Sequence, residues 1–221
     1  MRCVRIAALT LLLSVRADAQ TPSPAAVRID FNASEAGKAP PGFSTEVTGG
    51  GGPATWIVRE YTNASSGRRV LMQTSADKTD YRFPLCIYDS LLTHNAVMSV
   101  RFKTVSGSVD QAAGLVARFR DKDNYYVARA NALEDNVRFY KVVDGRRTQL
   151  AGSDVKVTPQ TWHALKLSLK MHTFEVWLDG TRLFGGDDMA LQEAGEVGLW
   201  TKADSVTAFD DFLIEESDAG H

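Results

Sequence analysis

The sequence is poor in cysteine, with only Cys3 and Cys86 among its 221 residues. Cys3 falls in an N-terminal segment that we expect to be removed, so the remaining chain would hold one thiol and no internal disulfide. Cys86 lies between Leu85 and Ile87, a setting typical of a small buried hydrophobic residue rather than a nucleophile. Without disulfides, the fold has to be stabilised by its hydrophobic core.

Long hydrophobic runs are also missing. The most apolar stretch covers residues 6–15, and a membrane-spanning helix needs about 20 residues. This stretch follows Arg2 and Arg5 and precedes the A-x-A sequence of residues 17–19, which together form the pattern of a cleaved export signal. We therefore expect a signal peptide over residues 1–19 and an exported protein, periplasmic or extracellular, with no membrane span.

The rest of the chain has no obvious linker and no internal repeat. After a short leader over residues 20–26, we expect one domain over residues 27–216 and a polar tail over residues 217–221. The four consecutive glycines at Gly49–Gly52 are expected to form a flexible surface loop.

Positive charge is not in excess either. Loss of residues 1–19 leaves 22 basic and 26 acidic side chains, a net charge of about −4, which argues against a nucleic-acid partner. The chain has no H-E-x-x-H, no G-x-S-x-G, no phosphate-binding loop and no dinucleotide-binding fingerprint. The sequence therefore predicts no cofactor, apart from the calcium ion considered below.

The sequence does contain many short segments in which apolar and polar residues alternate. Asp144-Gly145 and Asp179-Gly180 are signals for tight hairpin turns, because glycine accepts a positive φ. Many short strands without a convincing helical period predict an all-β fold, a two-sheet antiparallel jelly-roll sandwich. The residues expected in its core are Leu115, Phe119, Phe139, Leu165, Leu167, Phe174, Val176 and Leu199.

Arg118, Arg129 and Arg138 interrupt three of the predicted strands. Burying an unpaired guanidinium costs several kcal/mol, so these side chains are expected to face away from the core. With Tyr125 and Tyr140, they would form one patch across neighbouring strands. Such a patch suits a sugar, because aromatic rings match the apolar face of a pyranose and arginine donates to hydroxyls or carboxylates.

The sequence leaves a simpler alternative open for this patch. Polar residues are routine on the solvent-facing side of an antiparallel sheet. The arginines could then pair with nearby carboxylates such as Asp121, Asp123 and Glu134, without binding any ligand.

The runs over residues 124–152, 174–184 and 194–212 resemble exported bacterial jelly-roll domains of the concanavalin A-like lectin/glucanase superfamily. Laminin-G-like domains share this fold, and such sequences are often grouped with family-16 glycoside hydrolases or 3-keto-disaccharide hydrolase-like domains. The resemblance implies two curved antiparallel sheets, with ligands held on the concave face or its rim loops. The positions that it nominates for ligand binding, together with the patch, are Arg118, Tyr125, Arg129, Asn131, Glu134, Asn136, Arg138, Tyr140, Trp200, Lys202 and Asp204.

The chain departs from the family-16 hydrolases in one respect that concerns catalysis. Those enzymes carry Glu-x-Asp-x-x-Glu on one strand, whereas Glu193 and Glu196 here lack the alternating middle carboxylate. A carbohydrate-binding, lectin-like module with a glycan or polysaccharide as partner is therefore the first hypothesis. A structural or protein-interaction domain of the envelope is the second, and a glycoside hydrolase-like enzyme is the third.

Asp30, near the start, and Asp210 and Asp211, near the end, are candidate ligands for a structural calcium ion. Related jelly-roll modules often hold such an ion between terminal-strand carboxylates and backbone carbonyls. The alternative is that they are ordinary exposed acids on edge strands, since Ca²⁺ needs six or more oxygen ligands and only three residues are nominated. The oligomeric state is not predicted.

Overall fold

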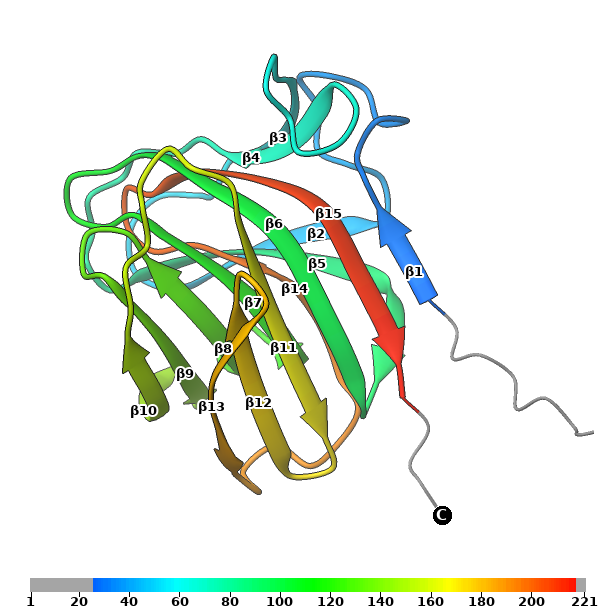
Figure 1. Ribbon diagram of the computed structural model, residues 1–221, viewed down its shortest axis with the longest axis vertical. Helices are drawn as coiled ribbons and strands as arrows, with labels where there is room; N and C mark the ends of the chain where they lie inside the picture. Colours follow the sequence, from blue (N-terminus) through cyan, green and yellow to red (C-terminus); the bar gives the residue numbers. More distant parts are fainter. Residues whose placement is uncertain (1–25, 218–221) are drawn as a thin grey trace, which may run out of the picture.

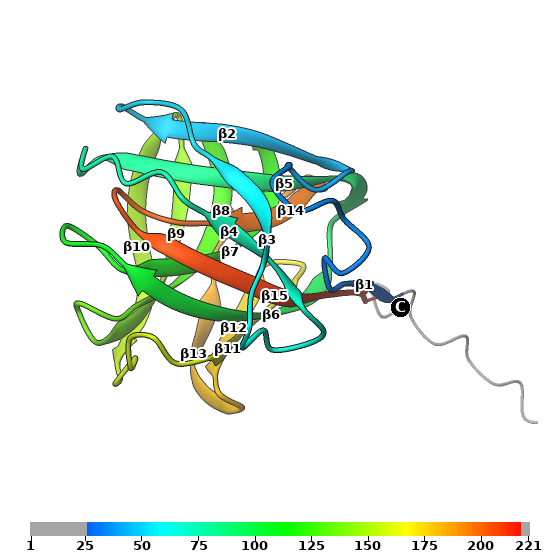
Figure 2. The same cartoon turned by 90° about the horizontal axis from the view of Figure 1, so that it is seen from above.

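The computed structural model describes residues 26–217, which form two antiparallel sheets packed face to face (Figures 1 and 2). Sheet A has the order β13-β12-β11-β6-β15-β4-β3, with β1 paired to β15, and sheet B has the order β10-β9-β8-β7-β14-β5-β2. The strands of sheet A are β1 (Ala26–Ile29), β3 (Trp56–Glu60), β4 (Arg69–Gln73), β6 (Ala96–Ser106), β11 (His163–Lys170), β12 (Thr173–Leu178), β13 (Thr181–Asp187) and β15 (Val206–Glu216). Those of sheet B are β2 (Phe43–Gly49), β5 (Arg82–Thr93), β7 (Ala112–Asp121), β8 (Asn124–Asn131), β9 (Asn136–Val143), β10 (Arg146–Asp154) and β14 (Gly195–Trp200).

This architecture confirms the predicted all-β, two-sheet antiparallel sandwich. The predicted signal peptide lies outside the described residues, as does nearly all of the predicted leader and tail. Within residues 26–217, no helix is long and apolar enough to cross a membrane.

Both predicted hairpin turns are present. Asp144 and Gly145 have φ values of 49° and 72° between β9 and β10, and Asp179 and Gly180 have values of 49° and 80° between β12 and β13. Two successive positive φ angles are what a two-residue hairpin of the type I′ class requires. These turns set the register of two neighbouring strand pairs.

The main core lies between the two sheets. Seven of the predicted core residues are buried there, namely Leu115, Phe139, Leu165, Leu167, Phe174, Val176 and Leu199. Cys86 is buried in the same cluster, and burial raises the pKa of its thiol well above the usual value. This confirms its predicted role as a small hydrophobic residue.

Phe119 is the exception, because a bulge changes the direction of its side chain. The pairing of β7 with β8 shifts between Ala117 and Asp121, and Arg118 within this interval has a φ of 48°. An extra residue in one strand reverses the faces of the residues that follow. Phe119 is therefore buried on the other face of sheet B, with its ring centroid 6.1 Å from that of Tyr125.

A second apolar layer covers this outer face of sheet B. Its buried members are Phe83, Leu85, Ile87, Ala112, Val116, Phe119, Tyr125, Val127, Tyr140, Val142 and Trp200. The sheet curls around them: Tyr81 Oη donates to the carbonyl of Gly145 at 2.9 Å, and Thr48 Oγ1 donates to the carbonyl of Lys122 at 2.5 Å. The centre of the concave face is thus filled by side chains, which leaves its rim as the accessible part.

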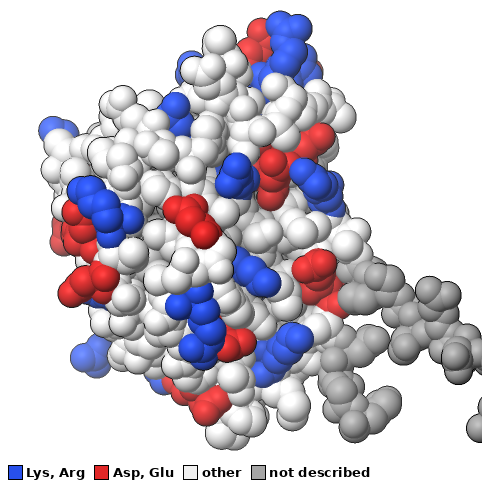
Figure 3. All heavy atoms as spheres, viewed as in Figure 1, with Lys and Arg blue, Asp and Glu red and all other residues white. Residues whose placement is uncertain are grey.

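Sheet A carries only a small apolar cluster apart from the main core, around Val70, Met72 and Ala208. Basic and acidic side chains are interspersed over the side of the molecule seen in Figure 3. One exposed pair, Arg182 and Glu175, lies on β13 and β12 with 2.6 Å between Nε and Oε1. Surface ion pairs of this kind contribute little to stability, and this pair offers a control for substitutions on sheet B.

Candidate glycan-contact site

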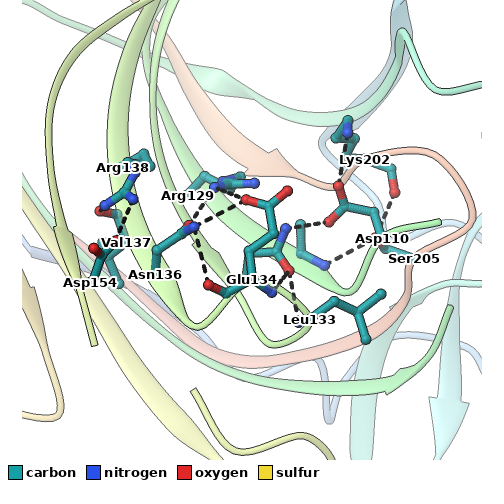
Figure 4. Close-up of polar contacts among 12 residues, drawn as sticks. Asp110, Arg129, Leu133, Glu134, Asn136, Val137, Arg138, Asp154, Lys202 and Ser205 are labelled. Carbon is teal, nitrogen blue, oxygen red and sulfur yellow. Dashed lines mark hydrogen bonds and ion pairs between the residues drawn. The ribbon is translucent and has the colours of Figure 1, made fainter. Parts of the chain in front are cut away.

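Three of the predicted residues form a connected group where β8 ends and β9 begins. Arg129 Nη2 donates to Glu134 Oε2 at 2.9 Å and to Asn136 Oδ1 at 2.5 Å (Figure 4). Asn136 Nδ2 also donates to Glu134 Oε2 at 3.1 Å. A buried guanidinium, an amide and a carboxylate are therefore held in one fixed arrangement.

The turn between these strands presents Glu134 to solvent. Asn131 Oδ1 accepts the backbone N–H of Leu133 at 2.9 Å and of Glu134 at 3.2 Å, a local bonding pattern that asparagine favours in turns. As a result, the Glu134 side chain is 46% exposed while that of Arg129 is 2% exposed. Partial burial tends to raise the pKa of Glu134, but the hydrogen bonds and charge of Arg129 outweigh it and hold the pKa below its usual value.

A second ion-paired group adjoins the first. Lys202 Nζ lies 3.0 Å from Asp110 Oδ2 and 2.7 Å from Asp80 Oδ1. Asn131 Nδ2 donates to Asp110 Oδ1 at 2.7 Å, so one asparagine joins the two groups. Burial raises the pKa of Asp110, and Lys202 offsets only part of this effect. We call the residues Arg129, Glu134, Asn136, Asp110 and Lys202 the rim cluster.

Asp204 was predicted to contact ligand, and the structure corrects this. Its side chain is buried and accepts the backbone N–H groups of Ser108, Val109 and Asp110 at 2.8, 3.0 and 3.0 Å. With both oxygens occupied inside the protein, Asp204 fixes the loop that carries Asp110. Its role at the rim cluster is therefore a positioning one. Asn131, fully buried, serves the same purpose for Glu134.

The predicted aromatic residues lie on the expected face of sheet B but beneath its surface. Trp200 and Tyr125 are fully buried, and Tyr140 is 8% exposed. The guanidinium carbon of Arg147 lies 4.5 Å from the ring centroid of Tyr140 and 4.6 Å from that of Phe83, within the range of cation–π contact. Trp200 was nominated as an outward-facing ligand contact, but Arg147 and neighbouring side chains cover its ring.

Two buried donors at this face lack an acceptor. Arg129 Nε and Arg147 Nη1 are both buried, and neither has a hydrogen-bond partner among residues 26–217. Both guanidinium groups lie over the same ring, since Arg129 is 5.7 Å from the Tyr140 centroid. Leaving such donors unpaired is costly. Both guanidinium groups instead lie against the Tyr140 ring, within the range of cation–π contact.

Arg118 does not belong to the patch in which it was predicted. Because of the bulge, its side chain is buried at the opposite end of sheet B, where Nε donates to the carbonyl of His94 at 3.0 Å and Nη1 to that of Leu191 at 2.7 Å. Nη2 donates to the carbonyl of Met171. A guanidinium with five donors can serve several carbonyls at once. Arg118 thus joins three loops and is removed from the set of candidate ligand contacts.

Arg138 lies where the sequence placed it, directly opposite Arg129 in the pairing of β8 with β9. Its guanidinium is paired with Asp154 on the edge strand β10 and is 19% exposed. This pair and the Arg129–Glu134 pair both match the alternative in which arginines on the sheet pair with nearby carboxylates.

The three acids nominated for calcium have other partners. Asp211 Oδ1 lies 2.6 Å from Arg28 Nη2, and buried Asp210 accepts the backbone N–H of Ser66 at 2.6 Å. Asp30 accepts the backbone N–H of Asn32 at 3.0 Å. No group of three or more His, Cys, Asp or Glu residues in the described part of the chain is arranged to hold a metal ion. A calcium site here stays a prediction.

The sequence interpretation missed Asp110, Asp80 and Arg147. Asp110 and Asp80 lie in loops, where no alternation indicates a side chain's direction. Arg147 could have been found, because the two-residue turn at Asp144-Gly145 pairs it with Val142. That register places it on the same face of sheet B as Tyr140.

Comparisons with known proteins bear on the fold. Neither protein-family models nor curated proteins give a match to this sequence. Among solved structures, the carbohydrate-binding module CBM66 from Bacillus subtilis is similar with a TM-score of 0.63 and 21% identity, over 79% of this chain and 96% of that one. The fold is a lectin-like jelly roll.

Two further structures agree with this jelly roll. The cellulose-induced protein Cip1 has a TM-score of 0.64 at 11% identity, over 86% of this chain and 97% of that one. Domain 4 of AbnA, a GH43 extracellular arabinanase from Geobacillus stearothermophilus in complex with arabinotriose, has a TM-score of 0.57 at 12% identity, over 89% and 94%. At such identities the jelly-roll fold is what these proteins share with the chain, so its ligand has to be argued from its own residues.

Proposed function

We propose that this chain is an exported glycan-binding module and that it binds sugar at the rim cluster of sheet B. The observation that carries the proposal is the Arg129–Glu134–Asn136 arrangement, in which an exposed carboxylate is fixed by a buried arginine that still has an unpaired Nε. Ligand sites combine a few fixed polar groups with apolar surface, and the rim cluster has both.

The rim cluster matches the chemistry of sugar hydroxyls. Each hydroxyl both donates and accepts a hydrogen bond. Glu134 supplies acceptor oxygens, and Lys202 has a third ammonium proton beyond those directed at Asp80 and Asp110. Hydrogen bonds to charged groups contribute about 1.5–3 kcal/mol each, so two or three would give measurable affinity.

Apolar side chains accompany these polar groups. Leu133 is 49% exposed beside Glu134, and Val109 is 39% exposed beside Asp110. They provide the kind of surface against which the C–H face of a sugar ring packs. The names of the similar structures, which include a carbohydrate-binding module and an arabinanase domain bound to arabinotriose, support the same class of ligand.

Binding to a panel of neutral and acidic polysaccharides, measured by calorimetry on the mature protein, tests this function. The unmodified protein and the Arg182→Ala control on sheet A should bind the same glycan equally well. Arg129→Ala should bind it at least tenfold more weakly. If no glycan in the panel is bound, or if Arg129→Ala binds normally, the rim cluster is not the site, and a structural or protein-interaction role becomes the better hypothesis.

A further inference from the structure

The rim cluster has its positive charges already neutralised, which bears on the class of sugar that it accepts. The guanidinium of Arg129 is paired with Glu134 at 2.9 Å. The ammonium of Lys202 lies between two carboxylates, Asp80 at 2.7 Å and Asp110 at 3.0 Å. The two cations and two acids of the rim cluster balance, and Asp80 beside Lys202 adds a third acid, so these side chains together carry a net negative charge.

The accessible atoms of the group are mainly acceptors. Glu134 uses Oε2 for both Arg129 and Asn136, and its Oε1 has no hydrogen-bond partner among the described residues. Asp80 is 77% exposed and Glu134 is 46% exposed, whereas Arg129 is 2% and Lys202 is 12% exposed. An approaching ligand therefore meets carboxylate oxygens before it meets the cations behind them.

A pair of adjacent hydroxyls suits this surface better than an anionic group. One hydroxyl can donate to Glu134 Oε1, and its neighbour can accept from the remaining proton of Lys202. A carboxylate or sulfate would offer acceptors only, and it would lie within a few ångströms of negatively charged oxygens, where like charges repel. Of the cations at this face, Arg129 and Lys202 are already engaged by carboxylates.

Resting on the proposed function, we infer that this site selects uncharged sugars with adjacent hydroxyl groups over sugars that carry a carboxylate or sulfate. The sequence left both classes open, because arginine alone can donate to either. The placement of Glu134, Asp80 and Asp110 around Arg129 and Lys202 decides between them.

Matched polysaccharides test this directly. Polygalacturonate and its carboxyl-reduced form share a backbone and differ in charge, and arabinan, mannan, alginate and heparin extend the two classes. We expect the best neutral ligand to bind at least tenfold more tightly than the best acidic one at 0.15 M salt. Glu134→Gln should weaken the binding of neutral ligands at least tenfold and reduce the difference in affinity between neutral and acidic ligands. Glu175 is an exposed, arginine-paired glutamate on sheet A, and Glu175→Gln should change neither the affinity for neutral ligands nor this difference.

The outcomes separate this inference from the function on which it rests. Tighter binding of acidic ligands that is lost in Arg129→Ala would overturn the charge selectivity while leaving glycan binding at the rim cluster intact. Equal binding of neutral and acidic ligands, if it is lost in Arg129→Ala, would also overturn the charge selectivity and leave glycan binding at the rim cluster intact. No binding by the unmodified protein, or binding that Arg129→Ala leaves unchanged, would overturn both.

Discussion

Arg118 and Arg129 lie at opposite ends of sheet B, and both are 2% exposed. Arg118 is surrounded by the carbonyls of His94, Met171 and Leu191, which come from three separate loops. Arg129 instead meets the side chains of Glu134 and Asn136 and keeps an unpaired Nε. Arg118 directs its donors at backbone carbonyls inside the protein, whereas Arg129 pairs with a surface carboxylate and keeps one N–H without an acceptor.

This difference separates structural arginines from candidate ligand contacts. Carbonyls from distant loops fix the relative positions of those loops, so the guanidinium acts as a cross-link. A partner carboxylate that is 46% exposed can exchange its own bonds with a ligand. Burial alone would have placed both arginines in one class, and the identity of their partners distinguishes them.

Replacing Arg118 should produce the largest effect on stability. Arg118→Met keeps much of the side-chain volume but leaves three carbonyls without their donor. The free energy of unfolding should therefore fall by about 2–5 kcal/mol. Glycan affinity should change less than twofold. Chemical denaturation gives the first quantity and calorimetry the second. A stability loss below about 0.5 kcal/mol would show that water replaces the guanidinium without cost.

Arg129→Ala should reduce glycan affinity more than it reduces stability. We expect affinity for the best glycan of the panel to fall by roughly 1.5–3 kcal/mol, the value of a hydrogen bond to a charged group. The free energy of unfolding should fall by only about 1–2 kcal/mol, because the partner left behind, Glu134, can be hydrated. If the unfolding free energy falls by more than the binding free energy, the comparison between the two arginines fails.

The sequence predicted the face of each side chain correctly wherever apolar and polar residues alternate along a strand without interruption. Leu167 and Leu199 lie in the core, and Arg129 faces Arg138 across two strands, as the period of two requires. It failed at Arg118, because a bulge with positive φ occurred at a residue that is not glycine. The two-residue repeat of a strand assigns each side chain to one face of the sheet, but a single inserted residue reverses that assignment for the residues that follow.

Alternation also says nothing about how strongly a sheet curves. Trp200 was assigned to the correct face, yet contacts such as Tyr81 with Gly145 fold the sheet over it. Such contacts join residues 64 positions apart. Loop residues such as Asp110 were missed for a related reason, since their positions depend on long-range bonds from Asp204.

Asp204→Asn should have a smaller effect that depends on pH. Burial tends to raise the pKa of Asp204, but the N–H groups of Ser108, Asp110 and Val109 outweigh it and hold the pKa below its usual value. The stabilisation is therefore present above the unfolded pKa of about 4 and is lost as the pH falls through the lower folded pKa. We expect a loss of about 1–2 kcal/mol at pH 7. The difference between Asp204→Asn and the unmodified protein should shrink when denaturation is repeated near pH 3.

Loosening this loop should also weaken binding at the rim cluster, because Asp110 would lose part of its support. Glycan affinity is expected to fall severalfold for Asp204→Asn at pH 7. An unchanged affinity would indicate that Lys202 and Asn131 hold Asp110 in place without Asp204.

Arg138→Ala should have the smallest effect. Its partner Asp154 is 85% exposed, and exposed ion pairs contribute about 0–1 kcal/mol. Thermal denaturation should show little change, and glycan affinity should stay within threefold of that of the unmodified protein. A loss of glycan affinity comparable to that of Arg129→Ala would mean that the site extends along β9, and Arg138 would then differ from Arg118 in the same way as Arg129.

The apolar layer on the concave face has a consequence for the dynamics of sheet B. Antiparallel sheets commonly have one face in water, but every residue of β8 from Tyr125 to Asn131 is buried. With hydrophobic layers on both sides, the amides of this strand have no route to solvent short of separating the sheet from one of its layers. Their hydrogen exchange should then report the opening of the whole domain, while the edge strands β10 and β13 exchange through local fraying.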